Sequence, residues 1–373
     1  RFILIMDLTD ELIVDFRETV NSNSGFVFQL YHSKEGNNYW NIICSCMDWI
    51  SVSVRFLSKD IVPDENVDVR VMQFFSVISA IDIVFESVVQ LHRVIYQNNK
   101  IPFKGIYEIF KGNKLELDDN DYFKEIRAMF GAHPVNLKGQ GNQKWFACWP
   151  YDHLTTNKTT FELRLYSNKV GVRDLTFGVH INELQNFLLQ RYKYLTDLKK
   201  EIIRQYDSFC KDMASQSIEA SDSSYELVLI LERESAKRLN NEYYNGVIYE
   251  LKKIYSTTLN EDRLAEEETE YKIILRKLID ELHRKLQAMS FTDLKFDKYL
   301  NPDYSYSDIG YSVSKLFTYE FKREQEPLFD FHMNKLDKYS SGHYRFSKTR
   351  NPDQIFLKLK MMLFKMSKNN DVS

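Results

Sequence analysis

Two long segments carry apolar residues at steps of three and four, and this spacing constrains the fold more than any other feature. The first runs from about residue 36 to 58 and the second from about 71 to 96. Such spacing lines up one apolar stripe along a helix. We therefore predict two long antiparallel helices that share a core. The apolar positions are Ile43, Met47, Ile50, Val54 and Leu57 in the first and Val71, Phe74, Ile78, Ile81, Phe85, Val88 and Leu91 in the second.

The scarcity of turn-forming residues favours the same helical architecture. Only 12 glycines and 7 prolines occur in 373 residues, which is roughly half of average usage. A chain of this length is also too long for one comfortable helical core, so two parts are expected. We predict a mainly α protein.

The apolar period changes to two between about 143 and 180. Short alternating runs at 145–149, 161–165 and 175–179 are separated by turn-like residues, which predicts a three-stranded antiparallel β-meander. Shorter helices are expected from Thr9 to a turn at 21–25 and from Asp119 or Asn120 to Gly131. From Ile181 the helical period returns and predicts one helix that extends to about Cys210.

A serine-rich stretch, 213–224, carries few apolar residues and is typical of a linker. We predict a bundle with its meander over 1–211, a linker over 212–224 and a second helical domain over 225–373. In the second domain, helical runs are expected at about 225–255 and 266–289.

Charge and cysteine content exclude several classes of protein. The net charge of -3 leaves no chain-wide basic surface for nucleic acid, so any RNA contact has to be local. Four scattered cysteines favour reduced thiols and a cytoplasmic protein. Asp48, Asp82 and Glu86 interrupt the long apolar runs, so we expect no membrane-spanning helix. No convincing set of metal ligands or cofactor motif is present, and none is expected.

Arg127 and His133 form the one constellation with chemical meaning. Residues six apart on an ideal helix point about 120° away from each other, so the two converge only if the helix ends between them. Gly131 and Pro134 provide that ending, because glycine readily adopts the left-handed conformation and a residue before proline leaves the helical region. Arginine can stabilise a phosphate anion and histidine titrates near neutral pH.

Arginine, four to six residues and then histidine, at the end of a late helix in a bundle, resembles the motif of the HEPN family. The resemblance covers the N-terminal half and implies a HEPN-like bundle that cleaves RNA without a metal, with Arg127 and His133 as catalytic residues. It also implies a homodimer and a role as a toxin or phage-defence effector. Where the family commonly has a polar residue after the arginine, this chain has Ala128.

RNA contacts are predicted at four further residues. Trp145 and Trp149 follow the motif and can stack on bases, although packing in the core of the meander explains them better. Lys348 and Arg350 belong to a basic tail that can contact phosphates. That tail also contains Arg345, Lys358, Lys360, Lys365 and Lys368.

Other interpretations remain open for these residues. Arg127 can instead pair with Glu125 or another local acid, and His133 can cap a helix C-terminus. Two other pairs have the same spacing: Arg173 with His180, in a strand, and Arg276 with His283, on a helix whose charges include Asp280 and Arg284. The alternative function is a non-catalytic helical module that binds RNA or, through the C-terminal domain, a protein partner.

Overall fold

The computed structural model divides the chain into two compact units, Arg1–Tyr206 and Asp207–Ser373. It describes residues 8–22, 24–59, 64–111, 116–132, 137–138, 143–148, 160–238, 241–304, 308–322 and 328–370. For residues 24, 131–132, 137–138, 160, 319–322 and 369–370 it describes the backbone alone. The mainly helical class with a small antiparallel sheet is confirmed.

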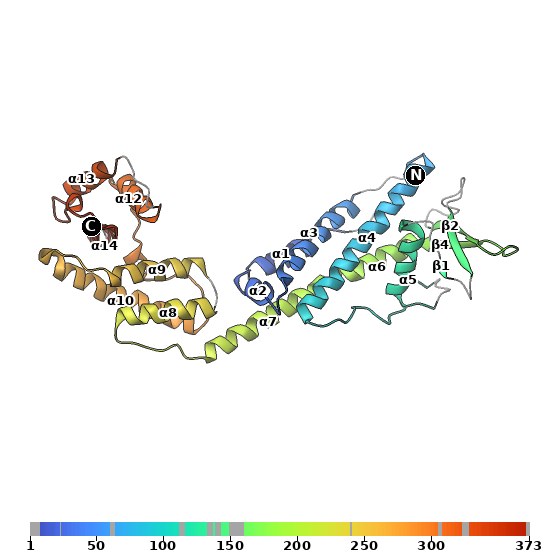
Figure 1. The fold of residues 1–373 in the computed structure, drawn as a ribbon, viewed down its shortest axis with the longest axis horizontal. Helices are drawn as coiled ribbons and strands as arrows, with labels where there is room; N and C mark the ends of the chain where they lie inside the picture. The colour runs from blue at the N-terminus through green and yellow to red at the C-terminus, as the bar shows by residue number, and fades with distance from the viewer. Residues whose placement is uncertain are drawn as a thin grey trace. The chain divides into compact units, whose positions relative to one another are not determined.

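The first unit is built around α4 (Val67–Tyr96), whose apolar face is buried along most of its length. α3 (Tyr39–Leu57) packs along α4 as the predicted antiparallel partner (Figure 1). α1 (Glu11–Ser22) and α2 (Ser24–Tyr31) pack against α3. α5 (Asp119–Arg127), the π-helical turn η1 (Ala128–Ala132) and α6 (Ile181–Lys193) also contact α4. The helix α4 therefore supports every element near the Arg127 motif.

A four-stranded antiparallel sheet in the order β1-β2-β3-β4 follows η1. Its strands are β1 (Leu137–Lys138), β2 (Lys144–Cys148), β3 (Thr160–Ser167) and β4 (Leu175–His180). The last three are the predicted meander, and the two-residue β1 is an addition. The ring of Phe161 stacks on Phe74 of α4 at 3.7 Å between centroids, and Phe130 of η1 meets Phe74 edge-on at 5.2 Å. These contacts join sheet, η1 and α4 in one core.

Two local predictions for this unit were wrong, and one strand was not predicted. The turn expected at 21–25 is replaced by α2, which begins again at Ser24 because Phe26 and Val27 supply further buried side chains. The single helix expected from Ile181 to Cys210 is interrupted at Tyr194 and continues as α7 (Leu195–Ser215). The strand β1 is only two residues long, too short for an alternating pattern to show in the sequence.

The helix α4 has the length and apolar composition of a membrane span, and 67% of its most apolar window is buried within the unit. The core helix of a globular domain meets the same test. The expected absence of a membrane-spanning helix stays a prediction.

In the second unit, α14 (Pro352–Asn370) is the central helix, and Ile355–Phe364 is buried without a break. α9 (Glu242–Ser256), α10 (Ala265–Gln287), α11 (Asp297–Leu300) and α12 (Gly310–Lys322) contact it. α8 (Ser224–Arg238) packs on α9 and α10, and α13 (Phe329–Tyr339) packs on α12. The short turns are η2 (Asp262–Leu264) and η3 (Phe346–Lys348). The helical run expected at 225–255 is thus two helices, α8 and α9.

The serine-rich stretch lies within the second unit, since the boundary between the units falls inside α7 at Tyr206 and Asp207. The sequence predicted that boundary at 211, followed by a linker over 212–224. Instead, α7 extends to Ser215, Ile218 is buried, and the amide of Ile218 donates to Gln287 Oε1 at 2.7 Å. Arg238 also donates to the carbonyl oxygens of Met213 and Gln216. These contacts hold the 213–224 segment in place, although its composition is typical of an exposed linker.

Candidate functional site

Three consecutive polar residues fix the start of α5. The Asp118 side chain accepts the Asp121 amide at 2.9 Å as N-cap, and Asp119 accepts the amides of residues 108–110. Asn120 donates to the Pro102 carbonyl at 2.9 Å and accepts from buried Arg191 at 2.7 Å. Because each of these groups is buried, leaving any one unpaired is costly. The N-terminus of α5 is therefore held firmly.

The other end of α5 leads directly into the motif. α5 contacts α4, and its buried side chains are Tyr122, Phe123 and Ile126. This packing leaves Arg127 at the last helical position, where its side chain is 52% exposed. The helix then widens into η1, and π-helical turns of this kind occur frequently at functional sites. His133 is the next residue in sequence and lies outside the described residues, as does Trp149.

Arg127 is oriented by Asp82 of α4, with 3.0 Å between its Nε and Asp82 Oδ2. The Asp82 side chain is only 9% exposed, and its second oxygen, Oδ1, is buried without a hydrogen-bond partner among the described residues. The ion pair uses Nε of Arg127, and its outer guanidinium nitrogens have no partner among the described residues. The acid that pairs with Arg127 is thus Asp82, rather than Glu125 of the alternative interpretation.

The electrostatics of Asp82 are set mainly by its surroundings. Burial raises its pKa to about 6, an effect that Arg127 opposes, Glu86 reinforces and Lys124 opposes. A half-exposed guanidinium bonded to a buried carboxylate is a fixed positive charge facing solvent. Such a group can bind a phosphate and stabilise charge that develops on it.

The pairing of Asp82 with Arg127 was not predicted from the sequence, although a signal for it was present. Asp82 follows Ile78 by four residues and precedes Phe85 by three, so helical spacing places it on the apolar stripe. A carboxylate on a core-facing position needs a charged or hydrogen-bonding partner. The interruption of an apolar run by an acid therefore points to a cation elsewhere in the chain.

The predicted RNA-contacting residues fall in both units. Trp145 is half-buried in β2, opposite Ser167 of β3. Lys348 and Arg350 are exposed in the second unit, where Arg350 pairs with Asp330 at 2.8 Å. Within the described part of the first unit, no contact joins Trp145 to Arg127.

Two lysines of the basic tail are buried, which removes them from any surface that contacts phosphates. Lys358 pairs with Glu261 at 2.5 Å and Lys360 with Glu250 at 2.7 Å. Desolvation lowers the pKa of both lysines, and the two glutamates oppose this effect. The buried charges of α14 are therefore neutralised by acids within the second unit.

The rival pairs are placed less favourably than Arg127. Arg173 precedes β4 and His180 ends it, so an extended strand of roughly 20 Å separates them. Arg276 is already engaged by Asp280 at 2.8 Å and by the carbonyl oxygens of Ser221 and Asp222. Neither arginine is presented to solvent beside its histidine in the way that the motif chemistry requires.

Among the described residues, no group of three metal-ligating side chains comes together. None of the four cysteines, all of which lie among the described residues, forms a disulfide. Comparisons with known proteins find no match to this chain among family models, curated proteins or solved structures.

Asp82→Asn should stabilise the protein at neutral pH. The folded-state pKa of about 6 lies above the usual value of 3.8, so the folded state holds this proton more tightly than the unfolded state does. Stability from this group is therefore present below about pH 4 and lost as pH rises through about 6. Between these limits the wild type should lose about 2–3 kcal/mol more unfolding free energy than the variant.

Urea unfolding at several pH values measures this difference. Asp15→Asn, which removes a half-exposed acid of the same unit, controls for loss of one negative charge. A wild-type-minus-variant difference in unfolding free energy that does not change with pH would refute the assignment.

Proposed function

We propose that the first unit is a metal-independent endoribonuclease whose catalytic residues are Arg127 and His133. The observation that supports this most is the placement of Arg127, half-exposed at the end of α5 and held by buried Asp82 at 3.0 Å. The helix widens at η1 directly before His133 in sequence. Resemblance to the HEPN family, carried by the spacing of the two residues, adds the expectation of a homodimer acting as a toxin or phage-defence effector.

The proposed reaction uses the ribose as its own nucleophile. His133 takes the proton of the 2′-hydroxyl, and the 2′-oxygen attacks the adjacent phosphorus as the bond to the 5′-oxygen breaks. Arg127 stabilises the negative charge on the phosphate oxygens. An acid protonates the leaving 5′-oxygen, and the products carry a 2′,3′-cyclic phosphate and a 5′-hydroxyl. Trp145 and Trp149, close to the motif in sequence, are the proposed stacking residues for bases.

The test is cleavage of single-stranded RNA by the purified full chain in excess EDTA. We expect EDTA-resistant cleavage, because attack by the 2′-hydroxyl needs a base but no metal-bound water. Cleavage that disappears with chelator and returns with a divalent cation would refute the mechanism. Binding of RNA without cleavage would instead favour the alternative, a non-catalytic RNA-binding module.

A further inference from the structure

A cavity in the second unit lies beside a lysine that the proposed nuclease mechanism does not use. The cavity has a volume of about 190 Å³ and is lined by side chains of α9, α11, α12 and α14 and of the residues that follow α11. Lys360 of α14 lines it, with a side chain that is only 4% exposed. An amine in this position can react only with a molecule that enters the cavity.

The ammonium group of Lys360 is held by two oxygen atoms and two aromatic rings. Its Nζ donates to Glu250 Oε2 at 2.7 Å and to Asn301 Oδ1 at 2.5 Å. The same nitrogen lies 5.1 Å from the ring centroid of Phe317 and 5.2 Å from that of Phe356. The amine therefore has a fixed position, in contact with a carboxylate that can accept a proton from it.

The other walls of the cavity are largely apolar. Leu300 and Leu363 are buried, and Tyr304 and Phe317 are half-buried. An apolar cavity of roughly 150 Å³ can hold benzene, so this cavity has room for one aromatic ring with a small substituent. A neutral ring compound suits these walls better than an anion, which would lose its hydration beside the Glu250 carboxylate.

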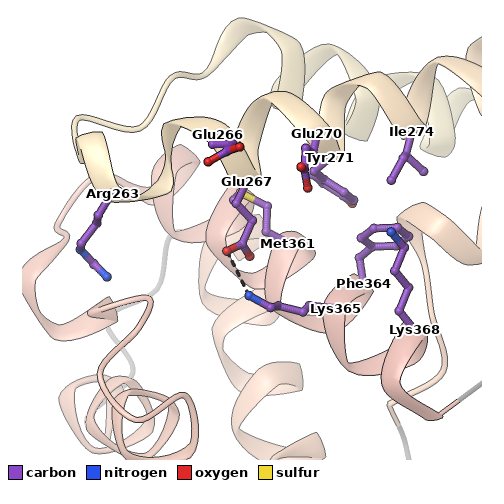
Figure 2. A pocket seen from close by; sticks show the side chains of 10 residues that line it. All are labelled: Arg263, Glu266, Glu267, Glu270, Tyr271, Ile274, Met361, Phe364, Lys365 and Lys368. Carbon is purple, nitrogen blue, oxygen red and sulfur yellow. Dashed lines mark hydrogen bonds and ion pairs between the residues drawn. The ribbon is translucent and has the colours of Figure 1, made fainter. Parts of the chain in front are cut away.

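Two other lysines of α14 share some of these features. Lys358 is equally buried and pairs with Glu261 at 2.5 Å, but it does not line this cavity. Lys365 lines a larger groove of about 560 Å³ between α10 and α14 and pairs with Glu267 at 3.3 Å (Figure 2), but its side chain is 55% exposed. Of these three lysines, Lys360 alone combines burial, an acid partner and a place on the wall of the smaller cavity.

Burial also favours the uncharged, nucleophilic form of the Lys360 amine. Desolvation lowers the pKa of Lys360, an effect that Glu250 and Asp297 oppose. Buried lysines with a lowered pKa are the residues that react with carbonyl compounds. Desolvation lowers the pKa of Lys358 as well, so the cavity is the feature that distinguishes Lys360 from it.

We propose that Lys360 forms a Schiff base with a small aromatic aldehyde bound in this cavity. Glu250 takes one proton from the ammonium group, and Nζ bonds to the carbonyl carbon. The carbonyl oxygen receives two protons that began on Nζ, one of them by way of Glu250, and leaves as water. The product is a protonated imine, whose positive charge still pairs with Glu250. This reaction of the second unit does not depend on the proposed ribonuclease.

The probe is benzaldehyde, with sodium cyanoborohydride present to reduce the imine to a stable benzylamine. The full chain is treated at neutral pH and digested, and mass spectrometry measures the label at each lysine over time. Lys360 should be labelled roughly tenfold or more faster than Lys358 and Lys365, because a bound aldehyde is held beside the amine. The rate at Lys360 should saturate with aldehyde concentration, whereas the rate at Lys365 should rise linearly.

A competitor and a variant test whether the cavity itself is the site. Toluene has the same ring without the carbonyl group, so it should slow labelling of Lys360 and leave Lys365 unchanged. Leu363→Phe adds bulk at the cavity wall and should lower the rate at Lys360 toward that at Lys358. The control Ile274→Phe adds bulk in the groove between α10 and α14 instead, and should keep the wild-type rate. Circular dichroism confirms that each variant is folded.

Four outcomes overturn the proposal. Equal labelling of Lys358 and Lys360 would mean that burial, rather than the cavity, sets reactivity. Label on exposed lysines alone would mean that no aldehyde reaches Lys360. A rate at Lys360 that rises linearly with aldehyde and does not respond to toluene would mean that no aldehyde is bound before it reacts. An unchanged rate in Leu363→Phe would place the reaction outside the cavity.

Discussion

Replacing His133 by alanine is expected to lower the rate of RNA cleavage by roughly 10²–10⁴-fold, the usual contribution of a general acid or base. Arg127→Ala should cost roughly 10²–10³-fold, because it removes the charge that stabilises the phosphate in the transition state. Arg127→Lys keeps the charge but loses the planar geometry that Asp82 orients, so partial activity is expected.

The measurement is the single-turnover rate on one labelled RNA. Arg204→Ala is the matched control, because Arg204 is an exposed arginine of the same unit that is paired with one acid, Glu201. Its rate should stay close to that of the wild type. Equal losses for Arg127→Ala and Arg204→Ala would mean that general positive charge, rather than the motif, supports cleavage.

The second large effect concerns assembly. Cleavage needs a base for the 2′-hydroxyl and an acid for the 5′-oxygen, and one His133 cannot supply both at once. In the proposed homodimer, two-fold symmetry brings both motifs to one cleft, with one His133 as base and the other as acid. A heterodimer of wild type with His133→Ala should therefore retain roughly 1% of the wild-type rate or less.

Tagged heterodimers, purified through both tags, allow this rate to be measured. Light scattering on the same samples gives the oligomeric state. A heterodimer that works at half of the wild-type rate, or a monomer with full activity, would show that each subunit has a complete site.

The helices of the first unit could be predicted because their apolar stripes are long. α3, α4 and the three main strands follow from residue spacing alone. The break at Tyr194 could not be predicted, because Leu188, Leu195 and Leu198 keep a helical spacing across it. A break between two helices that both face the core leaves no mark in the apolar pattern.

Only part of the candidate site could be predicted from the sequence. Arg127 and His133 stand out by residue type and spacing, whereas Asp82, the partner of Arg127, lies far earlier in the sequence, in α4. Only packing of α5 on α4 brings the two charges together. In the basic tail the sequence was misleading. Lys358 and Lys360 were predicted to be exposed, but both are buried and paired with acids that lie far away in the sequence.

The chemical ends of the cleaved RNA distinguish the proposed mechanism from its alternatives in one reaction. With EDTA present, the wild type should produce 2′,3′-cyclic phosphate and 5′-hydroxyl ends, and an RNA with a single 2′-deoxy substitution at the cut site should resist cleavage. Mass spectrometry of the products reads both results. Products with 3′-hydroxyl and 5′-phosphate ends, or cleavage at the 2′-deoxy position, would contradict catalysis by Arg127 and His133 through the 2′-hydroxyl.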